Sequence, residues 1–188
     1  RIRKVNHLQI EIPNSYWVNQ YGNPYNAEAY YETLGKEICS SVKKIDYVFI
    51  GVSSGGTITG VSQKVKEVYP KAKIIAVDIQ GSVIFGGTPK KRYIPGIGSS
   101  MVPNILTKAK IDEVITVSER DTINMCHDFS KAQGLLIGGS SGSVLVAIYT
   151  HFKGKKFKKR PNVVTIFPDK GERYLTTIYN DDWCKKVA

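Results

Sequence analysis

The chain has 188 residues, of which 41% are hydrophobic and 23% are charged. This length fits about one domain, and the hydrophobic fraction allows a buried core, so a disordered chain is excluded. No apolar stretch approaches the roughly 20 residues of a membrane-spanning helix, and no signal peptide opens the sequence. Because the sequence opens with Arg1 and residues 1–5 fit the middle of an amphipathic helix, we expect the chain to begin inside a longer protein.

The chain is strongly basic, with 27 Lys and Arg against 16 Asp and Glu and a formal net charge of +11. Such a charge suits nucleic acid, a membrane surface or anionic small molecules. The densest basic run, residues 153–160, stands just before Pro161, and we interpret it as a solvated loop between a helix and a strand. Nucleic-acid binding is the alternative interpretation of this run.

The three cysteines, Cys39, Cys126 and Cys184, are far apart and have no histidine nearby at a metal-ligand spacing. This arrangement disfavours both a disulfide scaffold and a zinc site. We therefore expect reduced thiols and a cytoplasmic protein.

Short apolar runs alternate along the chain with longer amphipathic segments. The predicted strands are 16–20, 47–52, 73–77, 113–117, 135–137 and 163–167, and the predicted helices are 28–42, 57–69, 118–133 and 143–152. The strands are rich in Val and Ile and show no polar alternation, which is typical of strands buried on both faces. The alternation of strands and helices predicts an α/β fold with a doubly wound, mostly parallel sheet and helices on both faces.

A glycine-rich loop, residues 51–60, connects a predicted strand to a predicted helix. The free amides and the dipole of a helix N-terminus favour an anion, so the loop has the chemistry of a phosphate-binding site. It lacks the Lys of a Walker A loop and the spacing of a dinucleotide fingerprint. Asp78 nevertheless follows about 20 residues later in the sequence, a spacing suited to a ribose-binding acid, so nicotinamide binding stays a weaker alternative. A strand-to-helix turn that binds no ligand is the other alternative.

Three further segments surround the same predicted crevice. Residues 138–143 form a second Gly- and Ser-rich loop between a strand and a helix, and residues 167–175 form a charged turn, for which a simple turn with a surface ion pair is the alternative interpretation. Residues 80–103 form a long loop rich in Gly, Pro and Ser after the strand 73–77. Loops that follow parallel strands border the ligand crevice of an open α/β sheet, so we expect these segments to converge.

Taken in order, the loop 53–57, the segment 95–98, the loop 138–143 and the segment 168–175 resemble the cysteine synthase and cystathionine β-synthase family. These proteins are pyridoxal-phosphate enzymes of fold type II, and the resemblance covers nearly the whole chain. It implies that residues 1–188 form the large, C-terminal, cofactor-binding domain of a longer transferase, an amino-acid biosynthetic enzyme that is cytoplasmic and a homodimer.

The resemblance also implies roles for individual residues. The cofactor phosphate would bind at Ser53, Ser54, Gly55, Gly56 and Thr57. Ser140 would hydrogen-bond the pyridine nitrogen, Pro168 would lie near the ring edge, and Gly96 and Ile97 would line the substrate side. A neutral hydroxyl at the ring nitrogen does not force its protonation, which favours elimination at Cβ over transamination.

The sequence departs from the family at two points. Tyr30 stands where the family usually has His. The family's motif around the Schiff-base Lys and its substrate-carboxylate motif do not occur in these residues. We therefore expect the catalytic Lys and the small domain to lie outside the chain shown.

A narrower resemblance is to the siderophore-pathway synthases of this family, carried by residues 17–21, 76–78, 81–86 and 95–98 and by Ser53 in place of the usual Gly. It implies a β-replacement that joins O-phospho-L-serine to L-glutamate and releases phosphate, on the way to 2,3-diaminopropionate. The alternatives are a cysteine synthase that uses O-acetylserine or O-phosphoserine with sulfide and, more distantly, a non-catalytic or nucleic-acid-binding basic domain.

Overall fold

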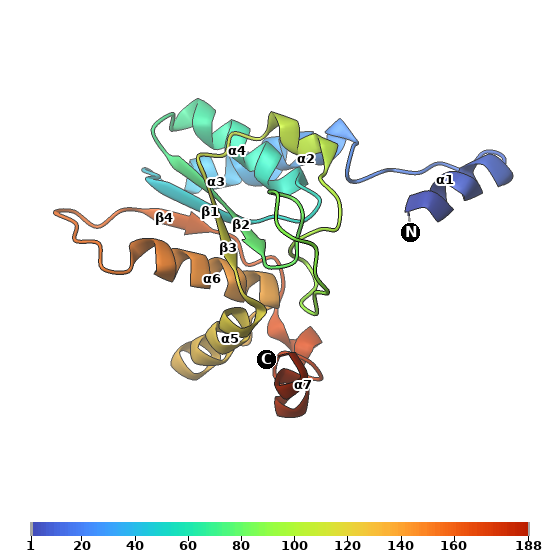
Figure 1. The fold of residues 1–188 in the computed structure, drawn as a ribbon. Coiled ribbons are helices and arrows are strands. Elements are labelled where there is room, and N and C mark those ends of the chain that lie inside the picture. Colours follow the sequence, from blue (N-terminus) through green and yellow to red (C-terminus); the bar gives the residue numbers. More distant parts are fainter. Residues whose placement is uncertain (1, 188) are drawn as a thin grey trace.

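A computed structural model of the chain describes residues 2–187. At its centre lies a four-stranded parallel sheet with the strand order β3-β2-β1-β4 (Figure 1). The strands are β1 (Tyr47–Gly51), β2 (Lys73–Ile79), β3 (Glu113–Val117) and β4 (Val163–Thr165). The helices are α1 (Ile2–Glu11), α2 (Pro24–Tyr30), α3 (Lys36–Ser41), α4 (Gly56–Val68), α5 (Glu119–Gln133), α6 (Gly139–Phe152) and α7 (Asp181–Val187), with three short helices η1 (Tyr31–Gly35), η2 (Asn104–Lys108) and η3 (Gly171–Tyr174). The predicted α/β fold is confirmed.

The two central strands, β1 and β2, are buried on both faces, and successive side chains of each lie on opposite sides. The edge strand β3 is mostly exposed, so the prediction that it is buried on both faces is wrong. Val48 and Ile74 belong to a buried cluster with the apolar residues of α4. Phe49 and Ile75, one residue further along each strand, belong to a second cluster with the apolar residues of α6. Helices thus cover both faces of the sheet, as the continuous apolar runs predict (Figure 1).

The order of the strands fixes the place of a ligand crevice. The chain runs from β1 to β2 and β3 on one side, and then returns through α5 and α6 to β4 on the other side of β1. The direction of winding therefore reverses between β1 and β4. In open α/β sheets, ligands bind beyond the carboxyl ends of the strands at such a switch point.

Several predicted boundaries are close to those observed. The strand 113–117 is found as predicted, and Ser118 caps α5 by accepting a hydrogen bond from the backbone N–H of Asp121 (3.0 Å). The predicted helix 28–42 is present as the consecutive helices α2, η1 and α3. Close packing joins these helices to α4, because a Cβ atom at Gly60 would lie 2.2 Å from the carbonyl oxygen of Ala27.

Two predicted strands are wrong. Residues 16–20 form no strand, and Tyr16 and Val18 are exposed, because this segment pairs with none of the strands described between residues 2 and 187. In the segment 135–137, only Ile137 makes a bridge, to Lys170. The helix α6 begins at Gly139 and not at residue 143, so the second glycine loop is itself the first turn of that helix.

The terminal elements add two observations. The helix α1, at the N-terminal end of the described residues, projects from the body and has no buried residue (Figure 1). The helix α7 has no counterpart in the predicted elements. Between residues 2 and 187, none of the helices combines the length and the apolar character needed to cross a bilayer.

Candidate cofactor and substrate site

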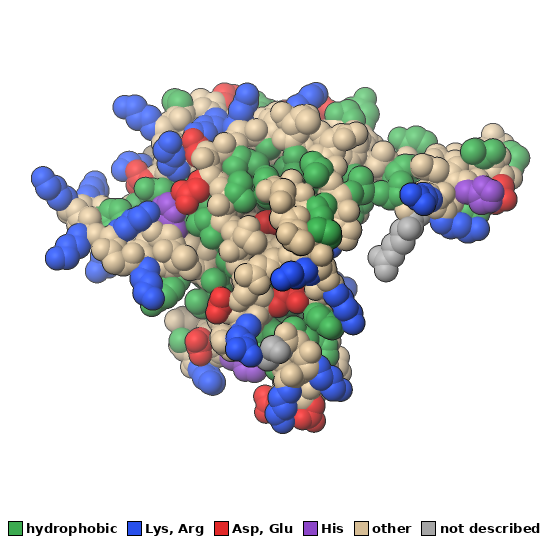
Figure 2. Space-filling view, in the orientation of Figure 1, with side chains coloured by type: hydrophobic (Ala, Val, Ile, Leu, Met, Phe, Trp, Pro, Cys, Tyr) green, Lys and Arg blue, Asp and Glu red, His purple; other side chains and the backbone are tan. Residues whose placement is uncertain are grey.

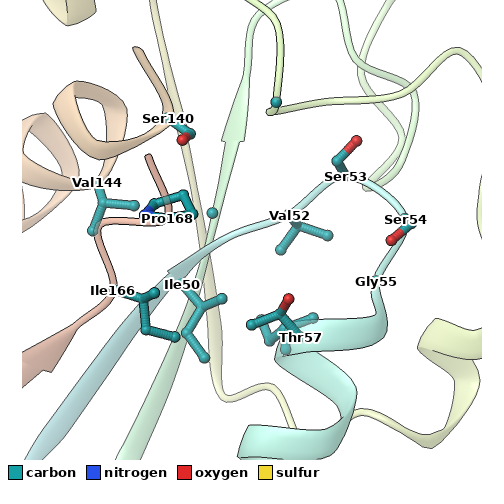
Figure 3. A pocket seen from close by; sticks show the side chains of 13 residues that line it. Ile50, Val52, Ser53, Ser54, Gly55, Thr57, Ser140, Val144, Ile166 and Pro168 are labelled. Atoms are coloured by element: carbon teal, nitrogen blue, oxygen red, sulfur yellow. The ribbon is translucent and has the colours of Figure 1, made fainter. Parts of the chain in front are cut away.

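A pocket of about 190 Å³ opens at the carboxyl ends of β1 and β4, at the switch point of the sheet (Figure 3). Its residues come from the end of β1, the following loop, the first turns of α4 and α6, the 80–103 loop and the segment after β4. They are Ile50, Gly51, Val52, Ser53, Ser54, Gly55, Thr57, Ile58, Gly96, Ser140, Val144, Ile166 and Pro168. Segments far apart in the sequence therefore converge on one crevice.

The loop before α4 takes its shape from Gly55. This residue caps the helix with a left-handed conformation (φ 88°), which a side chain rarely adopts. A Cβ atom here would also lie 2.7 Å from Cγ of Leu106. The turn leaves the first amides of α4 at the pocket, where Ser54 and Thr57 add hydroxyl groups (Figure 3). Because the first four N–H groups of a helix have no partner within it, this wall suits an anion.

The opposite wall is the first turn of α6. Ser140 lies in this turn, is 6% exposed and lines the pocket. Gly96 lies over it, since a Cβ atom at Gly96 would be 3.8 Å from the Ser140 Oγ. The pocket thus has a hydroxyl and a second helix N-terminus facing the first across its width (Figure 3).

The turn after β4 completes the site through Pro168. Its neighbour Asp169 accepts a hydrogen bond from the Tyr174 hydroxyl, and its carbonyl accepts one from the N–H of Gly138 (3.2 Å). Burial, together with the Asp169 carboxylate, raises the pKa of Tyr174 to about 12. Among the described residues this turn has no ion pair, which counts against the alternative of a simple turn with a surface ion pair; the Asp169 carboxylate accepts a hydrogen bond from the Tyr174 hydroxyl instead.

The structure brings most of the predicted site residues together. Ser53, Ser54, Gly55, Thr57, Gly96, Ser140 and Pro168 all line the pocket. Gly56 does not, because it lies against the side chain of Asn26, where a Cβ atom would be 2.2 Å from Oδ1. Ile97 is 2% exposed and packs in the core next to Gly51, so it supports the pocket from beneath.

The apolar walls, formed by Ile50, Val52, Val144 and Ile166, were not among the predicted site residues. Their signal in the sequence is weak, because a Val or Ile at a strand end is indistinguishable from a core residue until the strand order is known. An apolar wall with a few polar groups is typical of small-molecule sites.

Asp78 lies outside this pocket. It borders a separate cavity with Gly81 and Ser82, and its Oδ1 accepts a hydrogen bond from the N–H of Ile79 (2.8 Å). Burial raises the pKa of this carboxyl group. Because Asp78 and the 51–60 loop face different cavities, the geometry argues against their joint use as a dinucleotide site.

The fold and the pocket define an α/β protein that can bind a small anionic molecule at a switch point. The sequence profile of the family described as pyridoxal-phosphate dependent enzyme matches residues 1–169. The chain belongs to this family, and pyridoxal phosphate as the cofactor is confirmed.

A solved structure shows the same fold. The O-acetylserine dependent cystathionine beta-synthase from Helicobacter pylori is 35% identical, with a TM-score of 0.87 over 95% of this chain and 58% of that chain. The chain thus spans a little more than half of that relative's length.

Proposed function

We propose that this chain is the cofactor-binding domain of a pyridoxal-phosphate enzyme that carries out β-replacement on an activated serine. The observation that carries the proposal is the pocket at the switch point, with Thr57 on one wall and Ser140 on the other. Membership of the family and the likeness to the Helicobacter pylori synthase support it.

The residues of the pocket fit the cofactor. The first amides of α4, with the hydroxyls of Ser54 and Thr57, would hold the phosphate, and Ser53 would shape the loop through its bond to the Gly98 carbonyl. Ser140 would hydrogen-bond the ring nitrogen, and Pro168 and the apolar walls would contact the ring. When bound, the cofactor withdraws electrons from the Cα of an amino acid, and a neutral hydroxyl at its nitrogen keeps this withdrawal mild.

We further propose that residues 1–188 act together with a second, smaller domain outside them. That domain would supply the Schiff-base Lys, the group that removes the proton from the substrate Cα. The 58% coverage of the solved relative supports this arrangement. By resemblance to the family we also propose that the protein is cytoplasmic and that it is a homodimer. A measurement of molar mass in solution tests the homodimer.

For the substrates, we propose O-phospho-L-serine and L-glutamate, which would give N-(2-amino-2-carboxyethyl)-L-glutamate and phosphate for siderophore biosynthesis. This finer proposal rests on Ser53, whose hydroxyl donates a hydrogen bond to the carbonyl of Gly98 (3.2 Å). The phosphate-binding loop is thereby joined to the 95–98 segment, the predicted substrate side, through a side chain that a Gly would lack.

The second candidate is a cysteine synthase-type reaction with O-acetylserine and sulfide. The solved relative, which is described as O-acetylserine dependent, favours acetate as the leaving group. Both candidates use the same cofactor pocket, so the pocket alone does not separate them.

The test uses the full-length protein with pyridoxal phosphate and two substrate pairs. With O-phospho-L-serine and L-glutamate, we expect phosphate release that depends on glutamate and a product of the expected mass. The comparison pair is O-acetylserine with sulfide. If only O-acetylserine with sulfide gives a product, the cysteine synthase-type reaction replaces the siderophore-type proposal. If the protein forms neither product and does not bind the cofactor, the β-replacement proposal is overturned.

A further inference from the structure

The segments that precede the four strands concentrate basic residues at one edge of the sheet. We define this basic edge as residues 42–46, 70–73, 108–113 and 153–162, which lie before β1, β2, β3 and β4 and include Lys73 and Glu113, the first residues of β2 and β3. Because the strands are parallel, these segments share the amino end of the sheet, opposite the cofactor pocket. Figure 2 shows Lys and Arg side chains gathered around the loop between α6 and β4, at the left of the view.

The basic edge accounts for most of the net charge of the chain. It holds twelve Lys and Arg against three carboxylates, whereas the rest of the chain holds fifteen against thirteen. All twelve are exposed: Lys43, Lys44, Lys71, Lys73, Lys108, Lys110, Lys153, Lys155, Lys156, Lys158, Lys159 and Arg160. The remainder of the protein is thus close to neutral, and the excess is local.

The three carboxylates of the edge are already engaged. Asp46 pairs with Lys44 (2.7 Å), and Asp112 pairs with Lys66 (2.8 Å), which lies just outside the edge, and with Lys73 (3.4 Å). Glu113 lies 3.4 Å from the ring of His151. The loop 153–162 contains no carboxylate of its own. The positive charge of this loop is therefore not balanced locally.

The arrangement of the edge is linear. The strand order places the basic segments in the sequence 108–113, 70–73, 42–46 and 153–162 across the sheet. Neighbouring strands are about 4.8 Å apart, so the row spans roughly 15 Å before the long loop extends it. A row of charges matches a linear polyanion, whose charges are about 3.4 Å apart along one nucleic-acid strand.

We propose that the basic edge binds the sugar–phosphate backbone of nucleic acid, without reading its sequence. Eleven of its twelve cations are Lys, a mobile point charge suited to diffuse phosphate contacts, whereas bidentate base recognition favours Arg. A membrane surface fits less well. The large apolar side chain within the run, Phe157, is 43% exposed but packs edge-on against Phe152 (5.6 Å between ring centres), and a single such side chain offers little area for insertion into lipid.

The test measures binding of a fluorescent 20-base-pair DNA duplex to the full-length protein over a range of salt concentrations. The loop variant carries Lys155→Gln, Lys156→Gln, Lys158→Gln and Lys159→Gln. The matched control carries Lys4→Gln, Lys131→Gln, Lys185→Gln and Lys186→Gln, four exposed lysines outside the edge with the same loss of charge. Cofactor binding and thermal unfolding report on the fold of both variants.

For the unchanged protein we expect a slope of log affinity against log salt of about −4 or steeper, since each phosphate contact contributes about −0.9. The loop variant should lose most of that slope and about a hundredfold in affinity at low salt, and the control variant should lose little. Equal losses in the two variants would show only generic attraction to a basic protein and would overturn the proposal. So would binding to phosphatidylserine vesicles or to polyphosphate with no binding to DNA.

Discussion

The hydroxyl of Ser53 donates a hydrogen bond to the carbonyl oxygen of Gly98, and this bond ties the loop before α4 to the 95–98 segment. Gly96 of the same segment lies over Ser140 on the far wall of the pocket. One side-chain contact therefore links the proposed phosphate-binding loop to the loop that lies above the proposed ring-nitrogen ligand.

Replacing Ser53 tests whether this link sets the choice of the second substrate. Ser53→Gly removes the donor, and we expect the ratio of glutamate to sulfide turnover to fall about fivefold, the equivalent of one hydrogen bond of about 1 kcal/mol. Ser53→Thr keeps the hydroxyl and serves as the control. Competition assays with both acceptors measure the ratio. An unchanged ratio in Ser53→Gly would show that Ser53 does not determine the choice of the second substrate.

Gly55 is predicted to contribute to stability through both its backbone conformation and its close packing. In Gly55→Ala, the left-handed backbone costs about 1–2 kcal/mol, and the methyl group would also meet Leu106. Gly134, at the end of α5, has a similar φ of 68° but open space around it, so Gly134→Ala isolates the backbone cost. We expect Gly55→Ala to lower the free energy of unfolding by clearly more than the control in denaturant titrations. Equal losses of unfolding free energy in the two variants would contradict a contribution from the contact with Leu106.

Much of the fold could be predicted because the strands β1 and β2 are buried and rich in Val and Ile. The wrong strand 16–20 shows the limit of that signal. Tyr16 and Val18 favour β structure, but whether a partner strand exists depends on the rest of the fold. Likewise, in the apolar segment 135–137 only Ile137 is buried and makes a bridge, Leu136 is half-buried, and Leu135 is exposed.

The candidate site was predictable where backbone geometry demands a residue type. The glycine at position 55 follows from the turn, and the hydroxyls beside it follow from the chemistry of phosphate. Ile97 illustrates what the sequence leaves open. It adjoins the pocket-lining Gly96, and only the packing shows that its side chain enters the core.

Ser140 is predicted to contribute to cofactor affinity directly. Ser140→Ala should weaken binding of pyridoxal phosphate about three- to tenfold, the range expected for loss of one hydrogen bond. The neighbouring Ser141 has a buried hydroxyl with no hydrogen-bond partner among residues 2–187 and does not line the pocket, so Ser141→Ala is a matched control with little expected effect. Fluorescence titrations with the cofactor measure both. The proposed role fails if both variants bind as tightly as the unchanged protein.

Stability should fall at alkaline pH because three acidic groups are held protonated. Burial raises the pKa values of Cys126 and Tyr179 to about 12, as burial and Asp169 do for Tyr174. The unfolded chain releases these protons at lower pH, so this contribution is fully present below about pH 8.5 and is lost as the pH rises toward about 12.

Urea unfolding between pH 8 and 11 measures this loss. In Tyr174→Phe the hydrogen bond to Asp169 and one titrating group both disappear, so the variant should be less stable at pH 8 but should lose less stability between pH 9 and 11. Parallel pH profiles for the variant and the unchanged protein would show that Tyr174 does not contribute to the alkaline transition.

The most direct measurement compares the affinities of the full-length protein for pyridoxal phosphate and for pyridoxal, which lacks the phosphate. If the first turn of α4 binds the phosphate, pyridoxal should bind at least about thirtyfold more weakly, since each charge-assisted hydrogen bond contributes about 1.5–3 kcal/mol. Thr57→Ala should weaken the binding of pyridoxal phosphate and leave the affinity for pyridoxal unchanged. Equal affinities for the two compounds, or no saturable binding of either, would contradict the assignment of this pocket to the cofactor.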